Sequence, residues 1–337
     1  MKLVTTALAL TLAGPFAGIA GAQQITGAGS TFAAPIYGKW AEAAAAATGV
    51  KLNYQAIGSG AGINQINNRT VDFGASDMPV AAADLATHRL MQFPAVIGGV
   101  VVIVNIPGVE TNQLKLTGDL LAEIYLGRIA NWNDPRLVAL NPGVTLPNLA
   151  IAPVYRADGS GTTFVYTDYL SMLSPEWKSK VGSSTSVKWP AGNGAKGSDG
   201  VAATVRQVRG GIGYVESAYA SQNKLTTTMM RNKAGQFVAP TMEAFAAAAA
   251  AADWTTVQNF AIDLNDEPGA ASWPIESATF VLLPTDPKDP AQNAAVQKFF
   301  DWSFTNGNAI ATGLLYVPLP ASVQAAVRAA WKNPPKG

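Results

Sequence analysis

The chain has 337 residues, 48% hydrophobic and 13% charged, with a formal net charge of +1. This length allows two domains with a sizeable core, and a nearly neutral chain without a basic run is a poor nucleic-acid binder. With no cysteine, one histidine and no carboxylate cluster, we exclude a disulfide framework and thiol catalysis and expect no metal site and no cofactor.

The first 22 residues have the pattern of a cleaved export signal. Lys2 precedes an apolar run, and Ala20-Gly21-Ala22 offers a small-x-small cleavage pattern, so the mature chain is predicted to begin at Gln23. Glycines and a proline within residues 14–18 make a retained membrane-spanning helix the weaker alternative. We therefore predict a periplasmic protein without a lipid anchor.

The first glycine-rich turn follows a short predicted strand that begins at Gln24. Residues 27–32 read Gly-Ala-Gly-Ser-Thr-Phe, and a helix is predicted over 33–47 from apolar residues at spacings of four. We expect Ser30 or Thr31 to cap this helix. The N–H groups of Phe32 and its neighbours would then be directed outward.

A second turn of the same kind follows the predicted strand at 50–57. It reads Gly-Ser-Gly-Ala-Gly over 58–62, and residues 63–67 look helical. The next strand, 70–75, leads to Asp77, which lies where ligands bind in open α/β sheets. The alternative is that Asp77 caps a helix over 81–90.

Residues 93–106 are almost continuously apolar, which is long for one buried strand. Gly98 and Gly99 predict a hinge at which the chain crosses into a second domain. A strand at 277–283 is predicted to return, and helices are predicted at 243–252, 292–304 and 322–331. The predicted organisation is a signal peptide at 1–22, a discontinuous first domain at 23–99 and 275–337, and a second domain at 100–274.

The third turn is Arg-Ala-Asp-Gly-Ser-Gly-Thr at 156–162, delivered by a strand predicted at 149–154 and followed by a helical pattern. Glycines at a helix start let an anion approach free N–H groups at the positive end of the helix dipole. The Arg156 guanidinium can grip two oxygens of a tetrahedral anion such as phosphate or sulfate. The alternative is an ordinary capped helix, with Asp158 or Ser160 as the cap and Arg156 in solvent.

Two further glycine-rich patterns suggest other chemistry. Residues 192–197 match a dinucleotide fingerprint with Glu216 as the ribose acid, but Pro190 interrupts the approach, and we predict a loop that opens a helix over 199–209. Gly159-Ser160-Gly161 resembles a nucleophile elbow whose first motif glycine is replaced by Asp158. The only histidine, His88, is predicted on a surface helix, so no general base is evident. We expect no catalytic residues and no enzyme.

Several stretches, in this order along the chain, resemble the periplasmic phosphate-binding protein family of bacterial high-affinity phosphate ABC importers. They are residues 26–32, 57–60, 71–77, 156–162 and 211–216. The likeness extends from about Ile25 to Trp331. It implies a type II-like periplasmic binding protein fold, in which two α/β domains are joined by a hinge and enclose one phosphate in the cleft between them.

The resemblance also implies the ligand contacts, which are Thr31, Phe32, Ser59, Asp77, Arg156, Ser160, Gly161 and Thr162. Asp158 would hold the Arg156 guanidinium. Gly60 stands where relatives often carry a second hydroxyl. At this position only the backbone N–H could contact the ligand. A carboxylate at Asp77 should repel a buried anion unless the ligand carries a proton, as phosphate does and sulfate does not at neutral pH.

The function implied by the resemblance is periplasmic phosphate binding, followed by delivery to the permease and ATPase subunits of an ABC importer, by a monomer that binds no nucleic acid. Two alternatives remain at this point. One is a binding protein for another tetrahedral oxyanion, such as sulfate or molybdate. The other is a secreted phosphatase built on the same scaffold.

Overall fold

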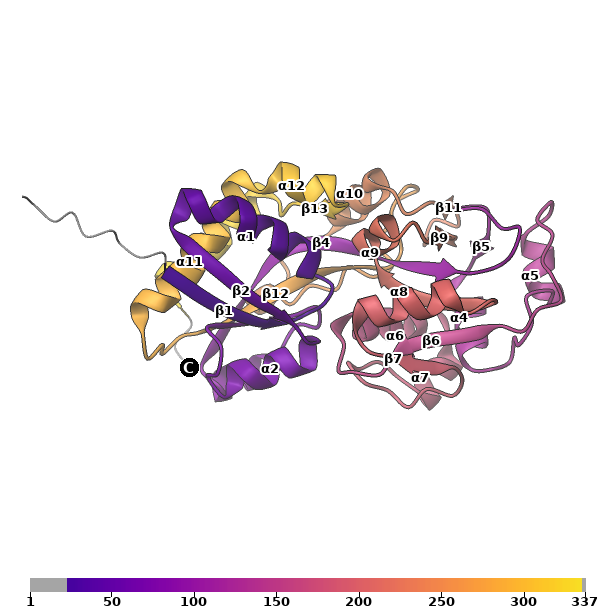
Figure 1. Cartoon of the computed structure of the whole chain (residues 1–337), viewed down its shortest axis with the longest axis horizontal. Helices are drawn as coiled ribbons and strands as arrows, with labels where there is room; N and C mark the ends of the chain where they lie inside the picture. The colour runs from indigo at the N-terminus through magenta and orange to yellow at the C-terminus, as the bar shows by residue number, and fades with distance from the viewer. Residues whose placement is uncertain (1–22, 335–337) are drawn as a thin grey trace, which may run out of the picture.

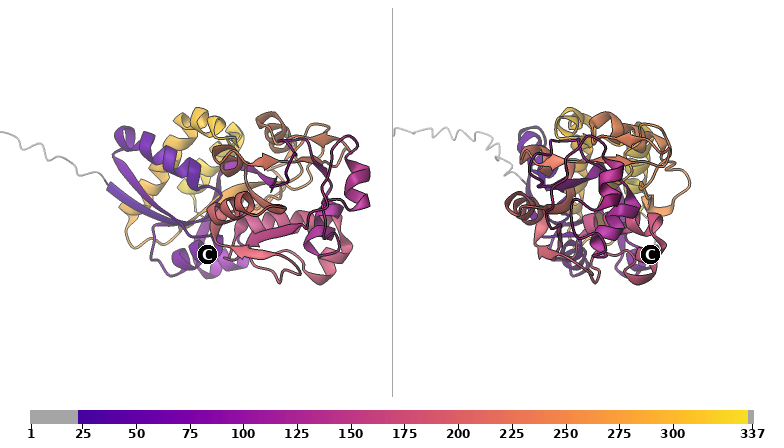
Figure 2. Two further views of the ribbon diagram at one scale, coloured as in Figure 1. Left: turned by 45° about the vertical axis from the view of Figure 1, so that its right-hand side comes forward. Right: turned by 90° about the vertical axis from the view of Figure 1, so that its right-hand side faces the viewer.

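The computed structural model describes residues 23–334, so the predicted signal peptide lies outside the described part of the chain. Two α/β lobes lie side by side along the long axis of the molecule (Figure 1). Viewed along that axis, one lobe covers the other (Figure 2). No helix within residues 23–334 has the length and apolar character needed to cross a membrane.

One mixed ten-stranded sheet runs through both lobes in the order β2-β1-β3-β12-β4-β8-β6-β7, with β9 and β13 also paired to β4. Its strands are β1 (Gln23–Gly29), β2 (Val50–Ala56), β3 (Phe73–Ser76), β4 (Leu90–Val104), β6 (Ala152–Arg156), β7 (Asn193–Ala195), β8 (Gly211–Glu216), β9 (Thr226–Thr227), β12 (Glu276–Pro284) and β13 (Tyr316–Val317). A small separate sheet has the order β11-β10-β5, from β5 (Lys115–Leu116), β10 (Met229–Arg231) and β11 (Phe237–Val238).

Strand β4 joins the two lobes. All of its 15 residues are buried, which explains the uninterrupted apolar run in the sequence. It pairs with β12 up to Gly99 and with β8 from Val100 onward, so the pairing partner changes next to the two adjacent glycines. Strand β12 returns antiparallel to β4. We use "first lobe" for the part of the molecule around β1, β2 and β3, and "second lobe" for the part around β6, β7 and β8.

Helices cover the sheet in both lobes (Figure 1). Those of the first lobe are α1 (Ala34–Thr48), α2 (Ser59–Asn67), α3 (Ala82–Thr87), α11 (Pro290–Asn306), α12 (Asn308–Gly313) and α13 (Ala321–Lys332). The others are α4 (Gly118–Tyr125), α5 (Pro135–Leu140), α6 (Gly161–Leu173), α7 (Pro175–Lys180), α8 (Gly197–Gln207), α9 (Ser217–Gln222), α10 (Met242–Ala251) and the 3-10 turn η1 (Gln258–Phe260).

Helix α1 shows how these elements form the core. Its apolar residues at spacings of four, Ile36, Trp40 and Ala44, are buried as the pattern predicted. Tyr37 packs edge-on against Phe300 of α11, with ring centroids 5.6 Å apart. This packing fixes the start of α1, and with it the turn after β1.

Several local predictions were wrong. The helix at 81–90 ends at Thr87, because Leu90 already pairs with β12 in β4. Residues 193–195 form strand β7 on the edge of β6 instead of a loop, since their backbone completes the hydrogen bonding of that strand. Helix α2 begins at Ser59, inside the glycine-rich turn, and not at residue 63.

The predicted helix caps also differ from the structure. The N-cap of α1 is Ala33, without a side-chain hydrogen bond, so neither Ser30 nor Thr31 has that position. The N-cap of α3 is Ala81, so Asp77 does not cap this helix. In the third turn Ser160, one of the two caps named in the capped-helix alternative, is the N-cap of α6. Thr31 and Asp77 are therefore left for other partners.

Candidate anion-binding site between the lobes

The first turns of α2 and α6 meet where the two lobes touch. A Cβ atom placed on Gly161 would lie 2.6 Å from the Ser59 Oγ and 2.7 Å from the Asp77 backbone nitrogen. The Gly60 N–H donates to the Gly159 carbonyl across the same contact, at 3.0 Å. The lobes are therefore closed on each other at this point. The first N–H groups of both helices, which lack intrahelical acceptors, lie at the positive ends of the helix dipoles.

Asp77 follows β3 and is 1% exposed. Its Oδ1 accepts hydrogen bonds from Ser30 Oγ at 2.5 Å and Thr279 Oγ1 at 2.7 Å, whereas Oδ2 has only the Ser59 Oγ at 3.5 Å. Burial raises the pKa of Asp77 to about 6, against the opposing effect of these hydrogen bonds and of the Arg156 charge. At neutral pH Asp77 is therefore mostly ionised, and Oδ2, whose one partner lies 3.5 Å away, can accept a hydrogen bond from a protonated ligand oxygen.

Arg156 ends β6, and its side chain is 1% exposed, so the alternative that it lies in solvent is wrong. Its Nε and Nη2 donate to the two carboxylate oxygens of Asp158 at 2.9 and 2.5 Å. The edge of the guanidinium between Nη1 and Nη2 remains for a ligand. Asp158 also accepts the Gly197 N–H at 2.9 Å. Burial opposes ionisation of Asp158, but Arg156 outweighs it and lowers the pKa of this carboxyl.

The α6 turn supplies hydroxyl groups. Ser160 is fully buried, and its Oγ accepts the Thr163 N–H at 3.1 Å, which leaves its own proton free to donate. The Thr162 Oγ1 is buried and has no hydrogen-bond partner within residues 23–334. An unpaired buried hydroxyl is unfavourable by about 1–3 kcal/mol. A ligand oxygen would satisfy both groups.

The residues predicted as ligand contacts are gathered in one buried place. Thr31 Oγ1 lies 2.9 Å from Ser198 Oγ, which in turn accepts from Arg156 Nη1 at 3.4 Å. Ser59, Asp77 and Gly161 pack directly on one another, as described above. Phe32 lies in the turn after β1, but its ring packs edge-on against Tyr316. Only the backbone of Phe32 is thus available to a ligand.

Gly60 has a different place from its neighbours. Its N–H is already donated to Gly159, so in this closed form it links the lobes and does not face a ligand. A Cβ at Gly60 would lie 3.3 Å from the Gly159 Cα, tighter than an ordinary contact. The glycine therefore permits the close approach of the two turns. This explains its presence without a ligand contact.

Sequence reasoning missed Ser30, Ser198 and Thr279. Ser30 adjoins Thr31 in the first turn, so its position was a usable signal. Ser198 lies in the first turn of α8, directly after the glycine-rich residues 192–197. Thr279 lies in β12, and nothing in its surrounding sequence marks it. The last two reach the site only through the fold.

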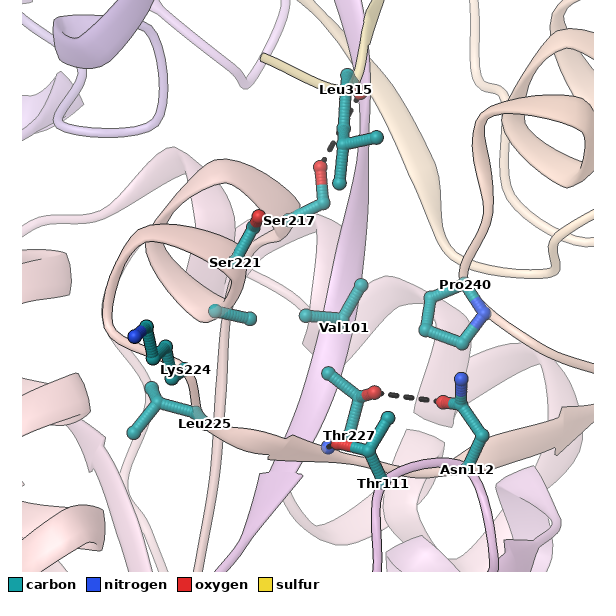
Figure 3. A pocket seen from close by; sticks show the side chains of 11 residues that line it. Val101, Thr111, Asn112, Ser217, Ser221, Lys224, Leu225, Thr227, Pro240 and Leu315 are labelled. Atoms are coloured by element: carbon teal, nitrogen blue, oxygen red, sulfur yellow. Dashed lines mark hydrogen bonds between the residues drawn. The ribbon is translucent and has the colours of Figure 1, made fainter. Parts of the chain in front are cut away.

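A separate pocket of about 340 Å³ lies on another part of the junction, beside β4 and α9 (Figure 3). Its lining residues include Val101, Asn112, Lys224 and Thr227, and none of the predicted contacts. At one of its walls the Ser217 Oγ lies 3.4 Å from the Leu315 carbonyl oxygen.

The family model described as "PBP superfamily domain" matches residues 16–306. The chain is 53% identical to the phosphate-binding protein PstS of Pasteurella multocida (strain Pm70), covering 93% of this chain and 91% of the relative. It is 52% identical to the phosphate-binding protein PstS of Haemophilus influenzae, covering 93% of each.

Solved structures share the fold at lower identity. A putative phosphate ABC transporter substrate-binding protein with bound phosphate from Clostridium perfringens has a TM-score of 0.65 at 17% identity, covering 88% of this chain and 100% of that one. A phosphate-binding protein from Stenotrophomonas maltophilia has a TM-score of 0.68 at 21% identity, covering 91% and 93%. The predicted periplasmic binding protein fold is thus confirmed. The chain belongs to the PstS family of phosphate-binding proteins in the PBP superfamily.

Proposed function

We propose that this chain binds inorganic phosphate between its lobes and delivers it to the permease and ATPase subunits of an ABC importer. The observation that carries the proposal is Asp77, an ionised buried carboxylate with one underused oxygen, beside two helix N-termini and an arginine. Only an anion that still carries a proton satisfies both kinds of group. The curated relatives, which bear the name phosphate-binding protein, support the same ligand.

Each predicted contact has a role in this proposal. The N–H groups at the starts of α2 and α6 and in the Thr31–Phe32 turn donate to the phosphate oxygens. Thr31, Ser59, Ser160 and Thr162 contribute hydroxyls, and Arg156 contributes its charge. Asp77 accepts the ligand's proton, and Asp158 positions Arg156. Exclusion of water strengthens each of these bonds.

Phosphate binding is coupled to closure of the lobes. Both lobes donate groups to the site, so neither alone can bury the ion. We place the first domain at 23–99 and 275–337 and the second at 100–274, with the hinge at Gly98–Gly99. The change of pairing partner in β4 between Gly99 and Val100 supports this position.

The ligand is tested by calorimetry on protein from which bound anions have been removed, titrated first with phosphate and then with sulfate and molybdate. We expect tight binding of phosphate alone. Tighter sulfate or molybdate binding would refute the proposal. Release of phosphate from an aryl phosphate ester, retained after extensive purification, would favour the phosphatase alternative.

The cellular location and the oligomeric state are also part of the proposal. We propose export to the periplasm with cleavage before Gln23, no lipid anchor, and function as a monomer. N-terminal sequencing and mass measurement of the protein released by osmotic shock would test cleavage and lipidation. Size-exclusion chromatography with light scattering would test the monomer. An uncleaved or membrane-retained product would contradict the localisation.

A further inference from the structure

Tyrosine hydroxyls hold consecutive carbonyls of the turn after β1. Tyr54 donates to the Ser30 carbonyl at 2.7 Å, and Tyr219 donates to the Thr31 carbonyl at 2.7 Å. Tyr316 donates to the Phe32 carbonyl at 2.5 Å. The three tyrosines come from β2, α9 and β13, so separate parts of the chain converge on one short turn.

The geometry of the peptide unit gives these contacts a consequence. In a planar trans peptide, the carbonyl of one residue and the N–H of the next point in opposite directions. A hydroxyl bound to the Ser30 carbonyl therefore directs the Thr31 N–H away from Tyr54. In the same way, Tyr219 on the Thr31 carbonyl directs the Phe32 N–H to the opposite side. The N–H groups of Thr31 and Phe32 are those offered to the anion. Tyr316 on the Phe32 carbonyl orients the next N–H, that of Ala33, which donates to Ser30 Oγ at 3.3 Å. Ser30 Oγ in turn donates to Asp77 at 2.5 Å.

Tyr316 is itself held by Glu216, the last residue of β8, which is fully buried opposite Val100 of β4. The Tyr316 Oη lies 2.9 Å from Glu216 Oε2 as well as 2.5 Å from the Phe32 carbonyl. A phenol has one proton, and a carbonyl can only accept. If that proton goes to the Phe32 carbonyl, which is the nearer of the two acceptors, then the contact with Glu216 is made by a proton on the carboxyl.

The other bonds of Glu216 agree with a neutral acid. Its Oε1 accepts from Ser217 Oγ at 2.6 Å, and both oxygens lie 2.9 Å from the Ala218 nitrogen. Neither Ser217 nor the Ala218 N–H requires Oε2 to be ionised. Within residues 23–334 no Lys or Arg pairs with this carboxyl. The ionisable groups that face it are Tyr316, Tyr219 and Asp77. Burial raises the pKa of Glu216 to about 8, and the Asp77 charge adds to the effect.

We propose that Tyr54 and Tyr219 are positioning residues that aim the N–H groups of Thr31 and Phe32 at the anion. Tyr316 fixes the end of the same turn at the Phe32 carbonyl, and with it the Ala33 N–H that holds Ser30, and Glu216, as a protonated acid, anchors Tyr316. The inference rests on the proposed phosphate site, whose ligand it does not change. Ionisation of Glu216 makes it compete for the Tyr316 proton and frees the Phe32 carbonyl. Phosphate affinity then decreases as the pH rises through the pKa of Glu216.

The hydroxyls are tested first, by calorimetry at pH 7 on Tyr54→Phe, Tyr219→Phe and Tyr316→Phe. Each should weaken phosphate binding about three- to tenfold, the range expected for one neutral hydrogen bond. The matched control is Tyr37→Phe, because the Tyr37 hydroxyl is buried without a partner among the described residues. Its affinity should equal that of the wild type. Unchanged affinity in Tyr219→Phe and Tyr316→Phe would overturn the proposal.

Glu216→Gln tests the proton, since an amide can donate to Tyr316 and accept from Ser217 and Ala218 at every pH. We expect this variant to bind phosphate within about twofold of the wild type at pH 7, and Glu216→Ala to bind more weakly. From pH 7 to about pH 9.5 the wild type should lose affinity relative to Glu216→Gln. This ratio cancels the titration of phosphate and of Asp77.

Separate outcomes identify what has failed. If the wild type binds no phosphate, the proposed function is wrong, and so is the role of the tyrosines and Glu216 in binding. If the wild type binds but its ratio to Glu216→Gln is constant with pH, Glu216 is not the proposed acid. An infrared carbonyl band of a protonated acid in the difference spectrum at pH 7 between the wild type and Glu216→Gln checks the proton without any ligand, because a protonated Glu276 contributes equally to both spectra.

Discussion

Asp77 places a negative charge in a buried site that otherwise consists of donors. The structure gives this carboxylate three hydroxyl neighbours, Ser30, Ser59 and Thr279, which keep it ionised at neutral pH despite its burial. An ionised acid accepts the proton of hydrogen phosphate but repels an anion without one. We therefore expect the side chain to act through selectivity more than through affinity.

Asp77→Asn should relax phosphate-over-sulfate selectivity more than it weakens phosphate binding. The amide removes the repulsion of sulfate and can donate to it, while the other donors continue to hold phosphate. Competition calorimetry with both anions measures the ratio of their dissociation constants. An equal ratio in wild type and variant would show that Asp77 does not discriminate between protonated and unprotonated anions.

Arg156→Ala should weaken phosphate binding by about 1.5–3 kcal/mol, the range for a hydrogen bond to a charged group. The substitution removes a buried charge that Asp158 holds in place. Arg136→Ala is a matched control, because Arg136 also pairs with an aspartate two residues away but is 46% exposed. A normal affinity for the Arg156 variant, measured by the same titration, would remove this residue from the site.

Glu276 makes stability depend on pH. It begins β12, is 1% exposed, and neither carboxyl oxygen has a partner in the described part of the chain. Burial raises its pKa well above 4.5, and Glu267 adds to this. Below about pH 4.5 the carboxyl is protonated whether the chain is folded or not. Above it only the unfolded chain ionises, so stability falls by about 1.4 kcal/mol per pH unit until the folded pKa is reached.

Glu276→Gln should abolish this contribution. The difference in unfolding free energy between variant and wild type should shift in favour of the variant as the pH rises from 4.5 to 7. Urea denaturation at several pH values measures it, and Glu110→Gln, at an exposed position, is the control. A difference that stays constant with pH would mean that Glu276 is ionised in the folded protein.

At the scale of elements, the start of α8 approaches the turn before α1 from the other lobe. Ser198 Oγ bridges Thr31 Oγ1 and Arg156 Nη1, so one hydroxyl links the lobes beside the site. Ser198→Ala should increase the phosphate dissociation rate about three- to tenfold with a smaller change in association, because the bond forms only after closure. Stopped-flow measurement would separate the two rates. A change confined to association would contradict a bond that forms on closure.

The sequence predicted the elements that carry the site because their signals are local. A strand, a turn of glycine and hydroxyl residues, and a helix follow one another at Thr31, Ser59 and Arg156, and the apolar pattern of β4 identified the crossing. The caps were less predictable. Ser30 was expected to cap α1, but the N-cap of this helix is Ala33. Ser30 Oγ instead accepts the Ala33 N–H at 3.3 Å and donates its own proton to the buried carboxylate of Asp77 at 2.5 Å.

The roles of residues that reach the site from distant elements could not be predicted from the sequence around them. Thr279 and Tyr219 reach the site through strand pairing and helix placement, which depend on the whole sheet. Glu216 had a visible motif, yet its spacing suggested a ribose-binding acid. The proposal that it is protonated rests on the distances to Tyr316 and on the single proton of a phenol.

At the scale of the whole molecule, the two lobes meet through glycines, because any larger residue would keep them apart. Gly161 lies against Ser59 and Asp77, so an added methyl group would have to displace both a side chain and backbone of the first lobe. Its own backbone is that of an ordinary first helical residue, which alanine adopts well. A substitution here should therefore affect closure and leave each lobe folded.

Gly161→Ala should bind phosphate at least about tenfold more weakly and remain open when phosphate is present, since a 2.6 Å contact cannot be kept in the closed form. Small-angle X-ray scattering would show a smaller radius of gyration on phosphate addition for the wild type but not for the variant. Gly38→Ala, in α1 with no atom near an added methyl group, is the control and should close normally. If Gly161→Ala closes and binds like the wild type, the contact between α2 and α6 does not limit closure, and the buried site must form with the lobes further apart.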